Sequence, residues 1–531
     1  MKRSTVVFLT IMYCTAAGTV ATSALQKMLP GHGLLPVSWK YAEFSARILS
    51  GYAERYLKYP MVHADAGDKN IDVAAQKNGK YRTAGHIAEQ TLNESMLMIP
   101  LVTAYDLIRY SGVLDESGKR NIEENLIRAM ADCINVYKSG KSNWQTWHNS
   151  ALLYAGIVLG DKEMVTQAYL DKENGFMTQM NISVLPEGMW YENSWGYHYY
   201  TLSALTIMAE GSRRLGIDIY SHEKMHKMYL IAFNYLMSDG SLPRFGDAVD
   251  DSPVNPSVNE EAYAFYKDER LLSTLPAEPT WDMISLGRDP NLKAELPKSG
   301  SNLIPGSGHA ILATNGPGKL TAAITYGPYG GFHGHFDKLS FVFFGYGQEL
   351  GVDPGRAASQ AYRLPIHREW YKATTGHNAV LVDGKSQKEA GGELIAYSAN
   401  ESYAAIAAYA GPAFDSIAHK RFMLLGPSYL LVVDQLNSSD GIEHTFDWLY
   451  HNKGNSVSCD MTSAEAIPGE LPSGYSYLKD VKAFKVDGSK PAGIIFSNDQ
   501  VSTHVTMLSD PADIVFLLQP GLCRVLLTEL L

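Results

Sequence analysis

The sequence of 531 residues predicts a multidomain α+β protein in which an all-helical half is followed by an antiparallel β-sandwich. Between about Trp39 and Met283, apolar residues recur at three- and four-residue spacing, as in LNESMLMIPLVTAYDLIRYSG, which is the period of amphipathic helices. After about Ser285 the sequence changes to short runs rich in β-branched and aromatic residues, such as KLTAAITYG and SYLLVVDQL. Gly, Pro and Asn turns separate these runs, as expected for strands joined by short connections.

The helical half consists of several helices in series with no strand between them. Their ends carry the expected signals, for example Ser111 and Gly112 after one helix and Asp115 before the next. Helices that follow one another in this way bury their apolar faces against each other, in a bundle, a solenoid or a toroid. Periodicity does not choose among these three arrangements.

A stretch rich in Gly, Pro, Ser and Asn separates the two halves. It covers residues 286–305, and its composition is typical of a linker. We therefore expect a helical domain over residues 25–285 and a β-domain over residues 306–531. Many short strands at close spacing favour an antiparallel sandwich for the second domain.

The first residues are typical of a secretory signal peptide. Lys2 and Arg3 form a basic start, an apolar core runs over residues 6–14, and small residues follow. This core is too short to span a bilayer, and no later segment is apolar for long enough. We therefore expect a signal peptide over residues 1–24, a periplasmic or secreted protein, and no membrane span.

The balance of charge limits the kinds of partner. The formal net charge is −11, and a chain with this charge has no general attraction to nucleic acid or to anionic membranes. We therefore expect no nucleic-acid partner, and local basic residues would have to bind any polyanionic substrate. Arg244, in LPRFGD, could clamp a carboxylate in this way or form an ordinary surface ion pair with an Asp.

Two aromatic segments of the helical half have the composition of a sugar-binding site. Residues 143–149 read NWQTWHN and open an apolar helix, and residues 187–200 read EGMWYENSWGYHYY. Aromatic rings stack on pyranose faces, while amides bind hydroxyl or carboxylate groups. The alternative interpretation is structural, with a capped helix start in the first segment and an aromatic core stripe in the second.

The run YGGFHGHFDK combines glycines with His333 and His335, which face the same way on an extended segment. Asp353 follows in GVDPGR and His377 in TTGHNAVLVDG. Two histidines and one aspartate are sound zinc ligands. Any chain with 16 histidines offers such combinations, however, so the spacing alone does not establish a metal site.

Taken together and in order, these segments resemble a known family. HGHFDKLSF, GVDPGR and HNAVLVDGKSQ resemble the heparinase II/III-like domain of polysaccharide lyases. NWQTWHNSALL and EGMWYENSWGYHYYTLSAL are similar to the alginate-lyase-type domain that precedes it. The resemblance covers most of the chain and implies an N-terminal (α/α) toroid followed by a C-terminal antiparallel β-sandwich.

The resemblance also implies roles for individual residues. Tyr197 stands at the position of the catalytic tyrosine, which protonates the leaving glycosidic oxygen and can also act as the base, and His333 matches the catalytic histidine. His148 or Asn149 matches the residue that neutralises the uronate carboxylate. A structural zinc ion is implied, with the ligands His335, Asp353 and His377.

The reaction implied by the same resemblance is β-elimination in a uronic-acid-containing glycan, with an anionic polysaccharide or oligosaccharide as the substrate. A base removes the C5 proton, an acid protonates the leaving C4 oxygen, and hydrogen-bond donors at the carboxylate stabilise the dianionic intermediate. Substrate contacts are expected from Trp147, Arg244, Arg356 and either Tyr362 or Tyr371.

Two other functions fit parts of the sequence. A glycoside hydrolase on an (α/α) toroid would need two carboxylates about 5–10 Å apart, for which Glu192 with Asp247 or Asp250 are candidates. A non-catalytic glycan-binding protein would keep the aromatic residues and tolerate the loss of Tyr197 and His333. A C4–C5 double bond in the products would separate the lyase from both alternatives.

Overall fold

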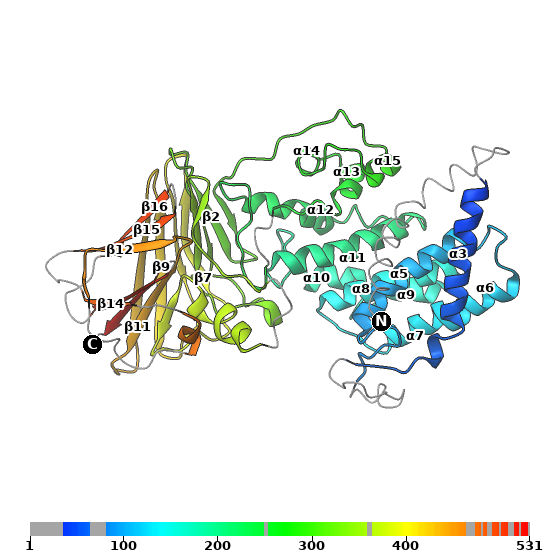
Figure 1. Cartoon of the computed structure of the whole chain (residues 1–531), viewed down its shortest axis with the longest axis horizontal. Helices are drawn as coiled ribbons and strands as arrows, with labels where there is room; N and C mark the ends of the chain where they lie inside the picture. The colour runs from blue at the N-terminus through cyan, green and yellow to red at the C-terminus, as the bar shows by residue number, and fades with distance from the viewer. Residues whose placement is uncertain are drawn as a thin grey trace. The chain divides into compact units, whose positions relative to one another are not determined.

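The chain forms two compact units (Figure 1). The helical unit comprises the described residues within Met1–Val184, Tyr200–His226 and Pro256–Ala294, and the sandwich unit those within Leu185–Tyr199, Lys227–Asn255 and Glu295–Leu531. The computed structural model describes residues 35–63, 81–248, 253–357, 364–463, 473–478, 482–485, 491–498, 501–507, 514–519 and 522–528. The expected signal peptide over residues 1–24, the contact candidate Tyr362 and the carboxylate candidate Asp250 lie outside these ranges.

The first half of the chain is helical, as its periodicity predicts. Its α-helices are α3 (Leu35–Ala53), α5 (Thr91–Ile108), α6 (Glu116–Ile122), α7 (Ala129–Asn135), α8 (Asn143–Leu159), α9 (Lys162–Leu170), α10 (Phe176–Ile182), α11 (Trp195–Arg213), α12 (Glu223–Leu230), α13 (Asn259–Tyr266), α14 (Glu269–Leu272) and α15 (Trp281–Leu286). Helix α6 begins as expected, because the Asp115 carboxylate accepts a hydrogen bond from the Gly118 N–H at 2.7 Å. Helix α8 begins after Ser142, whose hydroxyl accepts from the Trp144 N–H at 3.2 Å, and the residue that follows its last turn is Gly160, with φ 67°.

The second half of the chain consists of antiparallel sheets. Its strands are β1 (Asn302–Ile304), β2 (His309–Ala313), β3 (Thr321–Thr325), β4 (Phe341–Gly345), β5 (Gln348–Gly351), β6 (Val380–Val382), β7 (Glu393–Ala399), β8 (Ala404–Tyr409), β9 (Ile417–Leu425), β10 (Leu430–Ser438), β11 (Thr445–His451), β12 (Ser456–Cys459), β13 (Thr462–Ser463), β14 (Lys482–Lys485), β15 (Ala492–Asn498), β16 (Val501–Met507), β17 (Ile514–Gln519) and β18 (Leu522–Thr528). They form sheets with the strand orders β1-β2-β3-β4-β5, β10-β9-β8-β7, β13-β14-β17-β18-β11-β6 and β12-β15-β16. The predicted α+β class, helices followed by antiparallel sheets, is therefore confirmed.

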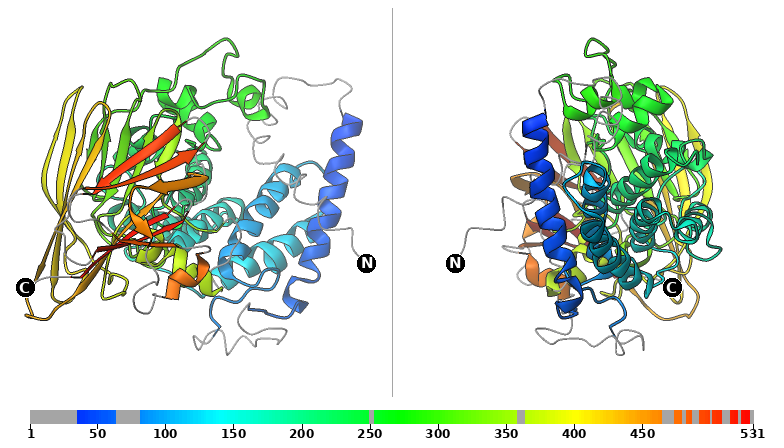
Figure 2. Two further views of the ribbon diagram at one scale, coloured as in Figure 1. Left: turned by 60° about the vertical axis from the view of Figure 1, so that its left-hand side comes forward. Right: turned by 90° about the vertical axis from the view of Figure 1, so that its right-hand side faces the viewer.

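The sheets bury one shared apolar core. Ile324 from β3 and Phe341 from β4 lie in the same buried cluster as Ile406 from β8, Met423 from β9 and Phe496 from β15. In β8 and β9 buried residues alternate with more exposed ones, as expected for a sheet with one face in the core. Figure 2 shows the strands of the sandwich unit, coloured green to red, as stacked layers.

Two segments of the helical half belong to the sandwich unit. They are Leu185–Tyr199 and Lys227–Asn255, so the first residues of α11 lie in one unit and the rest of the helix in the other. The expected division near residues 286–305 would place both segments in the helical domain. This arrangement matters for function, because it brings Tyr197 and Asp247 into the same compact unit as His333.

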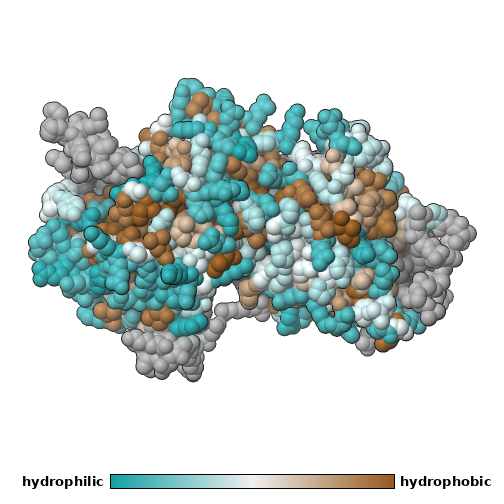
Figure 3. Space-filling view, turned by 180° about the vertical axis from the view of Figure 1, so that it is seen from behind, coloured by the Kyte–Doolittle hydropathy of each residue, from teal (hydrophilic) through white to brown (hydrophobic). Residues whose placement is uncertain are grey.

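The surface of the described residues is mixed in character. Figure 3 shows hydrophilic and hydrophobic side chains interspersed over the face that is seen from behind. Among the described residues, no helix is both long and apolar enough to cross a membrane.

A buried arginine joins two strands of the sandwich unit to the segments that precede β4 and β6. The Arg421 side chain on β9 is fully buried, and its Nε and Nη2 donate to the two carboxylate oxygens of Asp434 on β10 at 2.8 and 2.9 Å. His419 Nε2 contacts the same carboxylate at 2.7 Å. Arg421 Nη1 donates to the carbonyl oxygens of Leu339 and Asn378 at 2.5 and 2.7 Å. Burial alone would raise the pKa of Asp434, but Arg421 and His419 hold it well below its usual range.

We expect Asp434→Asn to lower the free energy of unfolding by about 3–5 kcal/mol, because it leaves a buried guanidinium without its carboxylate. In the wild-type protein, the contribution of Asp434 is fully present above about pH 4, the pKa of an unfolded aspartate. It is lost as the pH falls through the lower folded-state pKa. Denaturant unfolding at pH 7 and pH 3 measures both effects, and the variant should lose less stability between the two values.

Asp415→Asn is the matched control, because Asp415 pairs with Lys388 while both side chains are more than half exposed. This substitution should change stability by no more than about 0.5 kcal/mol. Equal losses in the two variants would contradict the importance of the buried pair.

Candidate active site

Tyr197 and His333 lie face to face. Tyr197 is half-buried in the first turn of α11, and His333 ends the short 3₁₀ helix Gly331–His333. Their ring centroids are 3.5 Å apart and the ring planes differ by 21°. The structure therefore brings together the two residues for which the sequence predicts proton transfer.

Asp247 holds two histidines at once. Its Oδ2 is 2.7 Å from Nδ1 of His333, and its Oδ1 is 3.0 Å from Nε2 of His335. The Asp247 side chain is only 1% exposed. Burial alone would raise the pKa of this carboxyl group, but the hydrogen bonds from the two histidines hold it well below its usual range. Asp247 is therefore an ionised acceptor between two rings.

Glu192 is the second carboxylate beside His333. Its Oε2 accepts a hydrogen bond from Trp190 Nε1 at 2.6 Å, and its Oε1 is 3.7 Å from His333 Nε2, which is longer than a hydrogen bond. Glu192 and Asp247, two of the three acids considered for a hydrolase, thus face one imidazole ring. Asp247 is committed to its two histidines, which does not suit a general acid that must exchange protons with substrate.

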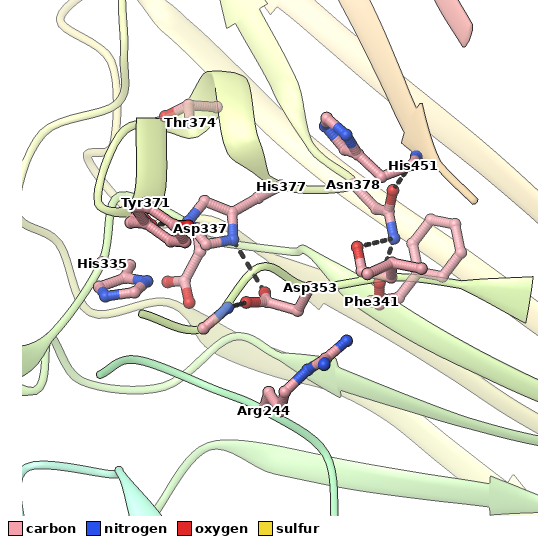
Figure 4. Close-up of polar contacts among 12 residues, drawn as sticks. Arg244, His335, Asp337, Phe341, Asp353, Tyr371, Thr374, His377, Asn378 and His451 are labelled. Carbon is pink, nitrogen blue, oxygen red and sulfur yellow. Dashed lines mark hydrogen bonds and ion pairs between the residues drawn. The ribbon is translucent and has the colours of Figure 1, made fainter. Parts of the chain in front are cut away.

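His335, Asp353 and His377 form a buried cluster that could hold a metal ion. One ligand atom from each lies within 4.8 Å of the others, and the residues are 2%, 0% and 0% exposed. Asp353 Oδ2 is 2.8 Å from His377 Nδ1, and Figure 4 shows the three side chains converging, with Asp337 beside them. His335 Nδ1 is buried and has no hydrogen-bond partner among the described residues. This orphaned nitrogen and the N/O donor set fit a metal such as zinc.

Tyr371 supports this cluster through its backbone. Its carbonyl oxygen accepts a hydrogen bond from His377 Nε2 at 3.1 Å, at the end of the π-helical turn His367–Tyr371. One-turn π-helices are frequent at functional sites. The contact seen here is made by the Tyr371 carbonyl oxygen and orients the His377 ring. The half-buried Tyr371 side chain, for which the sequence suggests a contact with substrate, takes no part in it.

Arg244 is paired inside the protein. Its Nη2 donates to both carboxylate oxygens of Glu349 at 2.7 Å, with the Arg244 side chain 8% and the Glu349 side chain 6% exposed. Lys453 Nζ lies 2.6 Å from the same carboxylate. Arg356 is half-buried, and its backbone N–H donates to the carbonyl oxygen of Ala248 at 2.9 Å. Arg244 thus neutralises a buried glutamate rather than pointing a guanidinium at the surface.

Sequence reasoning missed Lys372 and Phe332. Phe332 precedes His333, packs edge-on against its ring with centroids 5.0 Å apart, and is 75% exposed. Lys372 Nζ donates to the carbonyl oxygen of Phe332 at 2.9 Å and lies 5.5 Å from the Phe332 ring centroid. An exposed ring beside a cation suits an anionic sugar. Phe332 lies within the motif YGGFHGHFDK. Lys372 is 40 residues further along the chain and lies in none of the motifs that predict the site.

In the helical unit, the neighbours His148 and Asn149 have different surroundings. Asn149 Nδ2 donates to the carbonyl oxygen of Asn174 at 2.7 Å, and its Oδ1 accepts from Gln145 Nε2 at 2.9 Å. Both ring nitrogens of His148 are buried, and the backbone of Thr91 is a polar neighbour of this ring. Burial lowers the pKa of His148 to about 3, so the ring is neutral at pH 7. The preceding Trp147 is 6% exposed and packs against Tyr200.

Comparison with known families agrees with the predicted order of the two halves. Residues 296–507 match the family model described as heparinase II/III-like, C-terminal, and residues 76–241 match the one described as alginate lyase. The two matches follow one another in the predicted order. The chain belongs to the heparinase II/III-like and alginate-lyase-type family.

Two relatives of this family member are similar over most of its length. It is 25% identical over 480 residues to an alginate lyase of Stenotrophomonas maltophilia, which covers 79% of this chain and 63% of the relative. It is 25% identical over 469 residues to an exo-oligoalginate lyase of Saccharophagus degradans, covering 78% and 60%. The chain therefore spans about three fifths of the length of these relatives.

Solved structures of the family confirm the fold. A heparan sulfate lyase, HepC from Pedobacter heparinus, superposes with a TM-score of 0.56 at 14% identity, covering 91% of this chain and 70% of that one. A heparinase III, the BT4657 gene product, gives 0.56 at 16% identity, covering 91% and 74%. The likeness confirms an (α/α) toroid followed by an antiparallel β-sandwich.

Asn149→Ala should lower the free energy of unfolding of this family member by about 1–3 kcal/mol, because the buried carbonyl oxygen of Asn174 and the Gln145 amide lose their partner. Denaturant unfolding measures the change. Asn125→Ala is the control: its amide donates to Asn121 from a half-buried position, and its loss should cost about 0.5 kcal/mol or less. Equal stability of Asn149→Ala and the wild-type protein would contradict the structural role of Asn149.

Proposed function

We propose that this chain is a polysaccharide lyase that cleaves a uronic-acid-containing glycan by β-elimination and leaves unsaturated uronate ends. The stacked pair of Tyr197 and His333 carries the proposal, because it places an acid and a base at one locus. The names of the relatives agree with a uronate substrate, since alginate and heparan sulfate both contain uronic acids.

The reaction needs two proton transfers, and the pair can supply both. We assign the removal of the C5 proton to Nε2 of His333, whose Nδ1 is held by Asp247. As the C4–O4 bond breaks and the C4–C5 double bond forms, the Tyr197 hydroxyl protonates the leaving oxygen. The proton that His333 took from C5 then passes to the Tyr197 phenolate, its stacked neighbour. No water is consumed, and both residues are restored.

Negative charge develops on the uronate carboxylate during the reaction and must be stabilised. In the sandwich unit, Lys372 beside the exposed Phe332 ring is a candidate for binding an anionic sugar. In the helical unit, we assign the carboxylate-binding role to His148 rather than Asn149, because both polar atoms of Asn149 are already used. A neutral His148 can donate one N–H to a carboxylate oxygen.

We propose that zinc occupies the cluster of His335, Asp353 and His377 and that its role is structural. Two imidazoles and one carboxylate are ligands that zinc accepts. When bound, the ion would tie the loop that carries His333 and His335 to the segments of Asp353 and His377. We further propose that residues 1–24 direct the protein to the periplasm or outside the cell, where anionic polysaccharides occur.

Tyr197→Phe should lower lyase activity by at least about 10²-fold, because it removes the acid and keeps the ring. The measurement is the ultraviolet absorbance of the C4–C5 double bond, first with a panel of uronate polymers and then with the polymer that is cleaved. The melting temperature should stay at the wild-type value, since the ring still stacks on His333.

Tyr199→Phe, in the same turn of α11, is the matched control and should react at the wild-type rate. Wild-type speed of Tyr197→Phe would remove Tyr197 from the mechanism. New reducing ends without new absorbance would show that the protein is a hydrolase and not a lyase. Binding of the polymer without any cleavage would show that it is a non-catalytic glycan-binding protein.

Purified protein should contain about one zinc ion per chain, because a buried site closed by protein ligands holds its metal. Removal by a strong chelator should lower the melting temperature, and re-addition of zinc should restore it. His377→Ala should lose both the zinc and this response, whereas His504→Ala, at an exposed position on β16, should keep them. A metal-free protein of equal stability would exclude the zinc site.

A further inference from the structure

The Asp247 carboxylate lies between two histidines to which different tasks are assigned. Oδ2 is 2.7 Å from Nδ1 of His333, and Oδ1 is 3.0 Å from Nε2 of His335. Each oxygen therefore serves one ring. His367 Nε2 is 3.9 Å from Oδ1, which is beyond hydrogen-bond distance. Each carboxylate oxygen lies at hydrogen-bond distance from one ring nitrogen, and both contacts are satisfied when the two rings donate to Asp247.

These donations decide which nitrogen of each neutral ring carries the lone pair. In His333 the proton is on Nδ1, and the lone pair is on Nε2, where a base is needed. In His335 the proton is on Nε2, and the lone pair is on Nδ1. That Nδ1 is the buried nitrogen without a hydrogen-bond partner among the described residues, as expected for an atom that faces a metal ion.

The other histidine of the cluster follows the same pattern. His377 Nε2 lies 3.1 Å from the carbonyl oxygen of Tyr371, which can only accept, so the proton is on Nε2. Its Nδ1 lies 2.8 Å from Asp353 Oδ2, which also accepts, so Nδ1 donates here and would give up this proton to bind an ion. Both histidines of the metal cluster thus present Nδ1, each with its Nε2 proton held by an oxygen, which is the usual support of metal-bound histidines.

The backbone fixes Asp247 against His333 as well. The Asp247 N–H donates to the carbonyl oxygen of His333 at 3.0 Å. The preceding Gly246 has φ 58°, and a Cβ there would lie 2.8 Å from the same carbonyl oxygen. Main-chain as well as side-chain contacts therefore hold the carboxylate against the loop that carries both histidines.

We propose that Asp247 is a positioning residue that fixes the tautomers of His333 and His335 together and so couples the catalytic pair to the metal cluster. The part that concerns His333 rests on the proposed lyase function, whereas the part that concerns His335 does not. One carboxylate then supports both the base and the metal ligand, and its removal must affect both.

Asp247→Ala tests this coupling, because it removes both acceptors. Its zinc affinity, measured by competition with a chromophoric chelator, should fall by about 10–100-fold. Its kcat should fall by at least about 10²-fold with KM little changed, since base orientation acts on the chemical step. A folded Asp247→Ala with wild-type zinc affinity or with wild-type kcat overturns the proposal.

Asp247→Asn keeps the shape of the side chain and provides the test if the alanine variant does not fold. An amide offers one acceptor oxygen and one donor nitrogen, so it can satisfy only one of the two rings. The variant must therefore lose zinc affinity, kcat or both, and wild-type values for both overturn the proposal.

Asp383→Asn is the matched control. Asp383 Oδ2 is 2.8 Å from His444 Nδ1, an Asp–His pair of similar length in the same unit, and this variant should keep wild-type zinc affinity and kcat. His333→Ala separates the two hypotheses, because it should lose kcat and keep zinc. Full lyase activity of His333→Ala would refute the proposed base, while the zinc affinity of Asp247→Ala would still decide whether Asp247 supports His335.

Discussion

Close main-chain contacts that only glycine permits hold the candidate site together. A Cβ at Gly330 would lie 2.5 Å from the carbonyl oxygen of Glu192, and one at Gly355 would lie 2.4 Å from that of Ala248. Gly246 approaches the carbonyl oxygen of His333 in the same way. Larger residues would push these segments apart, and a misplacement of about 1 Å can cost about 10²-fold in rate. The stacking of Tyr197 on His333 and the two hydrogen bonds of Asp247 depend on this packing.

Buried charge in the sandwich unit is paired, and the pairing affects which side chains are available to bind a substrate carboxylate. Arg244 and Lys453 both contact Glu349, yet burial still raises the pKa of this glutamate. A substrate carboxylate that captured Arg244 would take a partner from a buried acid, which costs several kcal/mol. Lys372 is half-buried and donates to a carbonyl oxygen instead. It can therefore bind an anionic sugar without leaving a protein charge unpaired.

The sequence predicts the parts of the site that lie within motifs. The order of helices and strands follows from periodicity, and the closeness of His335, Asp353 and His377 agrees with the resemblance on which they were chosen. The role of Asp247 was not foreseen, because its contacts to His333 and His335 join segments 86 and 88 residues apart. Substrate binding was expected of Arg244, because no local pattern indicates that its partner is Glu349, 105 residues further along the chain. Local pattern thus identifies residue types, while long-range packing decides which of them meet.

Burial separates the two tasks proposed for the histidine-rich loop. The side chains of His335, Asp353 and His377 are 0% exposed or nearly so, and a polysaccharide cannot reach an ion held among them. His333, two residues before His335, has a side chain that is 11% exposed, and it stacks on the half-buried Tyr197. A metal in the inner position would therefore act on the reaction through the geometry of the loop and not as a Lewis acid on the sugar. Asp247 is the group through which such an influence passes, because it contacts the inner and the outer histidine with the two oxygens of one carboxylate.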